Sequence, residues 1–180
     1  VRGKLFEHID KYIIADDVTL SDETEQWATI GLEGPASAEK LKTVSANLPT
    51  RDFGVSLWNG GFIAKISATG APGYRIFCPA NEHPHLIETL KAAGVEEADS
   101  EAINVVRLEH GKPRYGNDIT ERYLAQETNQ MHAVSFSKGC YLGQEIVERV
   151  RSRAQIHRVL TPVRIHSHTV PAPGTKLKVD

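Results

Sequence analysis

The stretch FGVSLWNGGFIAK, residues 53–65, contains two runs of β-prone residues on either side of Asn59-Gly60. An Asn-Gly pair in this setting is the strongest short-range signal for a β-hairpin, because both residues accept the positive φ values that a tight type I′ turn requires. We therefore expect two antiparallel strands that meet at this turn.

The segments around the hairpin alternate between strand and helix patterns. Residues 25–34 and 68–79 are strand-like. Helices are expected over residues 35–44, from His83 to Gly94 and over residues 101–111, where apolar residues recur at helical spacing. The order strand, helix, strands, helix predicts an α+β domain, with an antiparallel sheet and helices on one of its faces.

The two ends of the chain carry weaker patterns. Residues 3–14 are expected to form a helix and residues 18–22 a short strand, while residues 157–167 read as a strand that begins a new region. Residues 112–138 have little periodicity, and a long irregular stretch of this kind is often functional. A further helix is expected over residues 143–152. The start at Val1 and the strand-like end PGTKLKVD predict a fragment of a longer protein.

Composition and charge exclude several classes of protein. The 180 residues have a formal net charge of −2 and a hydrophobic share of 40%, which is typical of a soluble globular chain. The near-neutral charge disfavours wholesale binding of nucleic acid. No run of about 18 apolar residues occurs, so we expect no membrane span. Two cysteines are too few for a disulfide framework, and no Cys/His spacing matches a zinc site, so no metal site is expected.

The two cysteines lie in different surroundings. Cys78 belongs to the apolar strand YRIFCP and is expected in the core. Cys140 lies about one turn before a helix start and two residues after Lys138, which favours a reactive thiolate. Gly139 and Gly143 leave room for a ligand. From the residues alone, a small apolar residue in a tight turn is an equally good interpretation of Cys140.

Charged residues near these segments also have two interpretations. Glu109 ends a predicted helix, where its charge opposes the helix dipole. It is either a ligand contact, an exposed carboxylate, or the partner of Arg107 or Arg114. Glu145 and Arg149 are spaced for an ion pair. The basic cluster consists of Arg149, Arg151, Arg153 and Arg158. It suits an anionic ligand or partner, although a solvated helix face is the more ordinary reading.

Two stretches together resemble a known family. RLEHGKPRYGNDI, residues 107–119, resembles the segment that the aminomethyltransferases (the T-proteins of glycine cleavage) use near the pterin of tetrahydrofolate. KGCYLGQE, residues 138–145, is similar to the signature of their relatives, the YgfZ-type folate-binding proteins. Residues 30–41 and 68–79 fit the same superfamily, so the resemblance covers essentially the whole chain.

The resemblance implies a fold and a domain organisation. The fold would be the folate-binding T-protein fold, an α+β region with antiparallel sheets and helices, followed by a C-terminal β-barrel. Residues 1–157 would be the central part of the folate-binding region, with its N-terminal portion missing. Residues 158–180 would be the first strands of the truncated barrel.

The resemblance also implies a function. The protein would bind tetrahydrofolate as its cofactor and act in assembly or repair of iron–sulfur proteins, with Cys140 and Lys138 as the catalytic residues. The implied folate contacts are Arg107, Glu109, Tyr115, Gly139, Tyr141, Gln144, Glu145 and Arg149. Folate and iron–sulfur client or assembly proteins are the expected partners, in the cytoplasm or in the mitochondrial matrix if the source is eukaryotic.

Two rival functions stay open. The chain could belong to a folate-dependent aminomethyltransferase or demethylase, which leaves open whether it is part of an enzyme. It could instead bind structured RNA through its arginine cluster, in which case binding would fall steeply with salt and be indifferent to folate. The net charge makes this second rival the least favoured.

Overall fold

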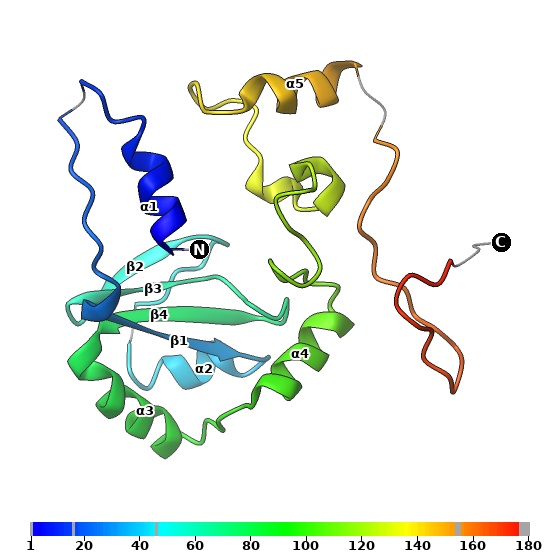
Figure 1. The fold of residues 1–180 in the computed structure, drawn as a ribbon. Helices are drawn as coiled ribbons and strands as arrows, with labels where there is room; N and C mark the ends of the chain where they lie inside the picture. The colour runs from blue at the N-terminus through cyan, green and yellow to red at the C-terminus, as the bar shows by residue number, and fades with distance from the viewer. Residues whose placement is uncertain (1, 16, 46, 154–155, 177–180) are drawn as a thin grey trace. The chain divides into compact units, whose positions relative to one another are not determined.

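The structure is a computed structural model that describes residues 2–15, 17–45, 47–153 and 156–176. It divides into two compact units, residues 1–110 and residues 111–180 (Figure 1). The first unit contains the sheet, and the second contains the segment around Cys140. Over the described residues, no helix is long and apolar enough to cross a membrane.

An antiparallel sheet of four strands forms the centre of the first unit. Its strands are β1 (Trp27–Glu33), β2 (Val55–Trp58), β3 (Gly61–Ala64) and β4 (Gly73–Pro79), in the order β1-β4-β3-β2. The expected hairpin is confirmed: β2 pairs with β3, and Asn59 and Gly60 have φ values of 42° and 76°. A side chain at Gly61 would collide with the carbonyl oxygen of Phe77 on β4, so the close approach of these strands requires glycine.

Two helices cover one face of this sheet. The helices are α2 (Ser37–Leu41) and α3 (His83–Ala92) (Figure 1). The buried core between sheet and helices consists of Leu32, Leu41, Ile63, Tyr74, Ile76, Cys78, Leu86 and Leu90. The α+β class and the core position of Cys78, which is fully buried, are therefore confirmed. Burial and the charge of Glu82 raise the pKa of the Cys78 thiol.

Local signals set the ends of the helices. Pro84 lies in the first turn of α3, and Gly94 follows this helix with a φ of 78°, as expected for a helix stop. The helix α4 (Ser100–Glu109) begins where the Asp99 side chain accepts a hydrogen bond of 2.8 Å from the Ala102 amide. It ends before Gly111, which has a φ of 61°. The first unit also contains two short 3₁₀ helices, η1 (Thr24–Gln26) and η2 (Ala80–Glu82).

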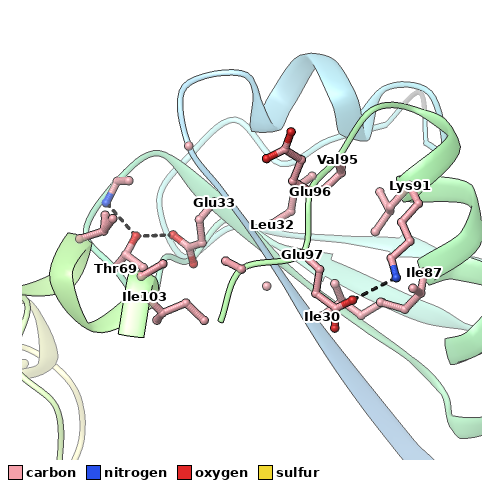
Figure 2. A pocket seen from close by; sticks show the side chains of 17 residues that line it. Ile30, Leu32, Glu33, Thr69, Ile87, Lys91, Val95, Glu96, Glu97 and Ile103 are labelled. Carbon is pink, nitrogen blue, oxygen red and sulfur yellow. Dashed lines mark hydrogen bonds and ion pairs between the residues drawn. The ribbon is translucent and has the colours of Figure 1, made fainter. Parts of the chain in front are cut away.

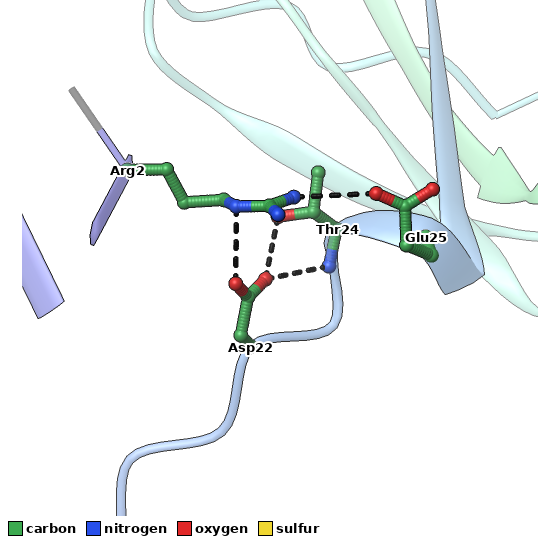
Figure 3. Close-up of polar contacts among 4 residues, drawn as sticks. All are labelled: Arg2, Asp22, Thr24 and Glu25. Atoms are coloured by element: carbon green, nitrogen blue, oxygen red, sulfur yellow. Dashed lines mark hydrogen bonds and ion pairs between the residues drawn. The ribbon is translucent and has the colours of Figure 1, made fainter.

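The strand predicted over residues 18–22 is wrong. The side chain of Asp22 instead accepts hydrogen bonds from the amide and the hydroxyl of Thr24, which form a local turn in place of a strand (Figure 3). Arg2, in helix α1 (Arg2–Asp10), pairs with Asp22 at 3.1 Å and with Glu25 at 3.3 Å. The Thr24 hydrogen bonds, with a smaller contribution from Arg2, hold the pKa of Asp22 below its usual value.

The second unit is built from short helices and irregular chain. Its helices are η3 (Ala125–Thr128), η4 (Met131–Ala133) and α5 (Gln144–Arg153). The strand predicted over residues 157–167 is wrong: residues 156–176, as described, contain none. The Leu160 amide donates to the carbonyl of Glu127 rather than to a neighbouring strand. The barrel boundary between residues 157 and 158 stays a prediction, and residues 177–180 lie outside the described residues.

Candidate functional site around the exposed thiol

Cys140 lies in the turn that leads into α5, and its side chain is exposed to solvent. Gly143 has a φ of 86°, which directs the chain into a helix that begins at Gln144. The Gln144 side chain reaches back and accepts a hydrogen bond of 3.0 Å from the Tyr141 amide. A helix start about one turn after the cysteine was expected, and the structure confirms it.

A pocket of about 520 Å³ opens beside this turn. Its lining residues are Ser135, Phe136, Lys138, Tyr141, Gln144, Glu145, Glu148, Arg149 and Ser152. Five of the predicted site residues therefore meet in one place. Gly139 and Cys140 do not line the pocket, although their neighbours Lys138 and Tyr141 do. A Cβ added to Gly139 would meet nothing within 4 Å, so this glycine has open space around it.

Cation–π contacts hold the side chains at the rim of this pocket. The Lys138 ammonium lies 4.4 Å from the centre of the Tyr141 ring, and the Arg151 guanidinium lies 4.4 Å from the centre of the Phe136 ring. Such contacts contribute about 0.5–1 kcal/mol at exposed sites. The first contact brings the Lys138 and Tyr141 side chains together.

The pocket carries charges of both signs. Arg151, which is not a lining residue, pairs with Glu148 at 3.4 Å. The pair expected between Glu145 and Arg149 is wrong, since the described residues form no such ion pair. Lys138, Glu145 and Arg149 thus line the pocket without an ion-pair partner in the described part of the chain. The two cations suit an anionic group of a ligand, and Glu145 suits a hydrogen-bond donor.

Three other predicted site residues do not line this pocket. Arg107 and Glu109 belong to α4 in the first unit. Arg107 is buried and its Nε donates to Asn104 at 2.7 Å, whereas Glu109 is exposed at the end of the helix. Tyr115 is exposed and its hydroxyl donates to Glu121 at 2.8 Å, a bond that raises the pKa of the phenol.

The sequence interpretation missed part of the pocket lining. Glu148 and Ser152 follow Glu145 at three and seven residues, so helical spacing places them on the same face of α5. This signal was available in the sequence. Ser135 and Phe136 come from irregular chain, where no periodicity points to them. Arg158, a member of the basic cluster, is engaged elsewhere: it pairs with Glu127 at 2.6 Å. Among the described residues, no group of three His, Cys, Asp or Glu residues could hold a metal ion.

The chain matches a known family and several curated proteins over most of its length. Residues 1–138 match the family described as the GCVT N-terminal domain. An aminomethyltransferase of Rubrobacter xylanophilus is 32% identical over 159 residues, which cover 84% of this chain and 43% of that protein. The tRNA-modifying protein YgfZ of Pectobacterium carotovorum subsp. carotovorum is 25% identical over 181 residues, which cover 99% of this chain and 54% of that protein.

These matches cover part of each relative and, for the family, part of this chain. The chain spans about half the length of the curated relatives it matches. The family match ends at Lys138, two residues before the exposed thiol. The sheet and α4 lie inside the matched region, while Cys140 and α5 lie just beyond it.

Proposed function

Because the chain belongs to the GCVT N-terminal domain family, we propose that it binds tetrahydrofolate and that its Cys140 thiol takes part in the assembly or repair of iron–sulfur proteins. The observation that carries the proposal is the exposure of Cys140 between two residues, Lys138 and Tyr141, that line a pocket. A thiol must reach solvent or a partner before it can attack or ligate. The buried Cys78 does not meet this requirement.

The proposed folate contacts follow from the chemistry of the vitamin. A pterin is flat and presents adjacent N–H groups, which a carboxylate accepts side by side as it does from arginine. Glu109 is exposed, and the family resemblance assigns the pterin contact to it. Within the second unit, Lys138 and Arg149 line a pocket together with Glu145 and Glu148, and the two cations suit an anionic group.

The iron–sulfur role uses Cys140 together with a partner. A cluster is usually held by four ligands, mostly cysteine thiolates. The described residues contain no group of three potential ligands. A client or assembly protein would therefore supply the remaining ligands, and Cys140 would supply one.

Calorimetric titration with tetrahydrofolate tests the cofactor assignment. We compare the native chain with Glu109→Gln, which keeps the size of the side chain and removes its charge. Loss of a charged hydrogen bond costs about 1.5–3 kcal/mol, so we expect roughly 10–100-fold weaker binding. Glu101→Gln, at another exposed position on α4, is the matched control. Equal affinity in the native chain and in Glu109→Gln would remove the pterin assignment.

A genetic experiment tests the thiol. Cys140→Ala is expected to leave tetrahydrofolate affinity unchanged and to abolish rescue of iron–sulfur enzyme activity in a deletion strain. Ser137→Ala, a similar small change in the same exposed turn, is the control. Full rescue by Cys140→Ala would contradict the assignment of the thiol, whatever the folate titration shows.

A second function is favoured by a specific observation. The aminomethyltransferase of Rubrobacter xylanophilus is more similar to this chain than the YgfZ protein of Pectobacterium carotovorum. A folate-dependent aminomethyltransferase would transfer a methylene group to tetrahydrofolate in a purified assay. Transfer that survives Cys140→Ala would favour this function over the iron–sulfur role.

A further inference from the structure

One edge of the sheet in the first unit is open. The Gly34 amide donates to the carbonyl of Pro72 at 2.8 Å, which continues the register between β1 and β4. Antiparallel strands alternate bonded and non-bonded pairs. The even-numbered residues of β1 therefore bond to β4, and the backbone groups of Thr29, Gly31 and Glu33 point to the other side. Thr29 and Gly31 are exposed.

This open edge has no partner strand in the described part of the chain. The sheet order begins with β1, whose neighbour is β4. No hydrogen bond to the backbone of Thr29, Gly31 or Glu33 is found among the described residues. A row of unpaired N–H and C=O groups on an edge strand is a template for an added strand.

An apolar groove of about 360 Å³ lies along the same strand (Figure 2). Its lining includes the even-numbered residues Ile30 and Leu32 of β1 and also the odd-numbered Gly31. The groove therefore includes one face of the strand as well as its edge. The opposite walls come from α3, from residues 95–98 and from α4. The apolar side chains of these walls are Ile87, Leu90, Val95, Ala98, Ala102, Ile103 and Val106.

The charges at this groove favour a cationic ligand. Its ionisable lining residues are Glu33, Lys91, Glu96 and Glu97. Lys91 is paired with Glu97 at 3.0 Å (Figure 2). The Glu33 carboxylate accepts hydrogen bonds from Ser67, Ala68 and Thr69. Glu96 is exposed and has no ion pair within the described residues. The groove thus offers a carboxylate to an incoming cation.

We propose that the groove beside β1 is a docking site for an extended segment of a partner protein, which adds as a strand to the free edge of β1. The segment would alternate apolar and polar residues, because alternate side chains of a strand point to the same side. Its apolar residues enter the groove between β1 and α4, and a lysine or arginine in the segment meets Glu96. The unpaired backbone groups select an extended main chain, and the groove and Glu96 select its side chains.

A second copy of this chain fits this edge less well. The β1 strand of a second copy, WATIGLE, contains no lysine or arginine, so it would bring no cation to Glu96. A segment that contains a lysine or arginine supplies this cation. The proposed occupant is therefore a segment of another protein.

Selection from a phage-displayed library of random peptides tests the proposal. The peptides are about ten residues long, enough to pair with β1. We expect the native chain to enrich sequences that alternate apolar and polar residues and contain lysine or arginine. The affinity of one enriched peptide is then measured against three variants of the chain.

Each variant removes one feature of the site. Gly31→Pro removes an N–H that faces the open edge, a position at which strands tolerate proline, and should weaken binding about fivefold. Glu96→Lys reverses the unpaired charge and should weaken binding about fivefold. Ile103→Asp puts a charge into the apolar wall and should weaken binding more than about tenfold. Glu101→Lys, exposed on α4 and outside the groove, is the control and should bind as the native chain does.

Four outcomes overturn the proposal. The first is a selection that enriches no alternating sequences. The second is an enriched peptide whose affinity is the same for native chain, Glu96→Lys and Ile103→Asp. The third is an equal loss of affinity in Glu101→Lys, which would indicate a non-specific charge effect. The fourth is a native dimer that Gly31→Pro converts to a monomer, which would assign the edge to a second copy. Circular dichroism establishes whether each variant is folded. If Gly31→Pro is not folded, the test uses Glu96→Lys, which changes an exposed position.

Discussion

Alkylation of the two cysteines is expected to separate them by several orders of magnitude in rate. Cys78 is fully buried, and Cys140 is exposed. An alkylating reagent such as iodoacetamide reaches Cys78 when the first unit opens. Opening that costs about 5 kcal/mol, the lower end for folded domains, slows the reaction about 5,000-fold. In the folded unit burial raises the pKa of the Cys78 thiol, so the closed form offers no faster route to alkylation.

Mass spectrometry of the intact chain measures this difference directly. The native chain is expected to take up one label rapidly, and Cys140→Ser none on the same timescale. Both cysteines should react at comparable rates after unfolding in concentrated guanidinium. The reasoning is refuted if the native chain takes up two labels at similar rates, or if Cys140→Ser is labelled rapidly. Either result would show that Cys78 is as accessible to the reagent as Cys140.

Three further changes test the fold. Ile76→Ala empties a fully buried position on β4 and should cost about 3 kcal/mol in urea unfolding followed by circular dichroism, whereas Leu57→Ala, at 86% exposure on β2, should change stability by less than about 0.5 kcal/mol. The Glu127 carboxyl, whose pKa is lowered by its hydrogen bond with Arg158, should titrate by NMR below the ordinary range of a glutamate, and at a higher pH in Arg158→Gln. The stability that this pair contributes is complete above the unfolded pKa and is lost as the pH falls through the folded pKa. Asp99→Ala removes the cap of α4 and should cost about 1 kcal/mol in thermal unfolding, and an unchanged midpoint would contradict that role.

Local chemistry explains which parts of the fold could be predicted from sequence. The turn at Asn59-Gly60 and the stop at Gly94 depend on φ values that few other residues accept, so a few residues specify them. The strand order β1-β4-β3-β2 depends on contacts between segments distant in the chain. The sequence pattern predicted antiparallel strands but not their order, so it did not predict that one edge of β1 is open.

The wrong strand predictions share a physical cause. An apolar alternation becomes a strand when a neighbouring strand accepts its backbone hydrogen bonds. Residues 157–167 have a strand-like composition, but the Leu160 amide bonds to Glu127 of a 3₁₀ helix. Residues 18–22 end in the turn that Asp22 forms with Thr24. The amino-acid composition of a segment does not indicate where a partner strand lies.

The candidate site was predictable where a short motif specifies it. Lys138, Tyr141, Gln144, Glu145 and Arg149 fall within twelve residues and do meet at one pocket. The motif did not reveal that Cys140 itself stays outside the pocket lining. That detail depends on which side chains the turn before α5 points inward, and the turn geometry is set by Gly143.

The tryptophans give the molecule a built-in optical reporter. The chain has two, Trp27 and Trp58, which stand on the two outermost strands of the same sheet. Their indoles donate to different acceptors, a carboxylate of Glu23 and a carbonyl of Val44, so their emission spectra should differ. The second unit, which contains Cys140, has no tryptophan and therefore contributes no tryptophan emission. Emission therefore records melting of the sheet alone, and a single engineered tryptophan near α5 would make the thiol segment visible by itself.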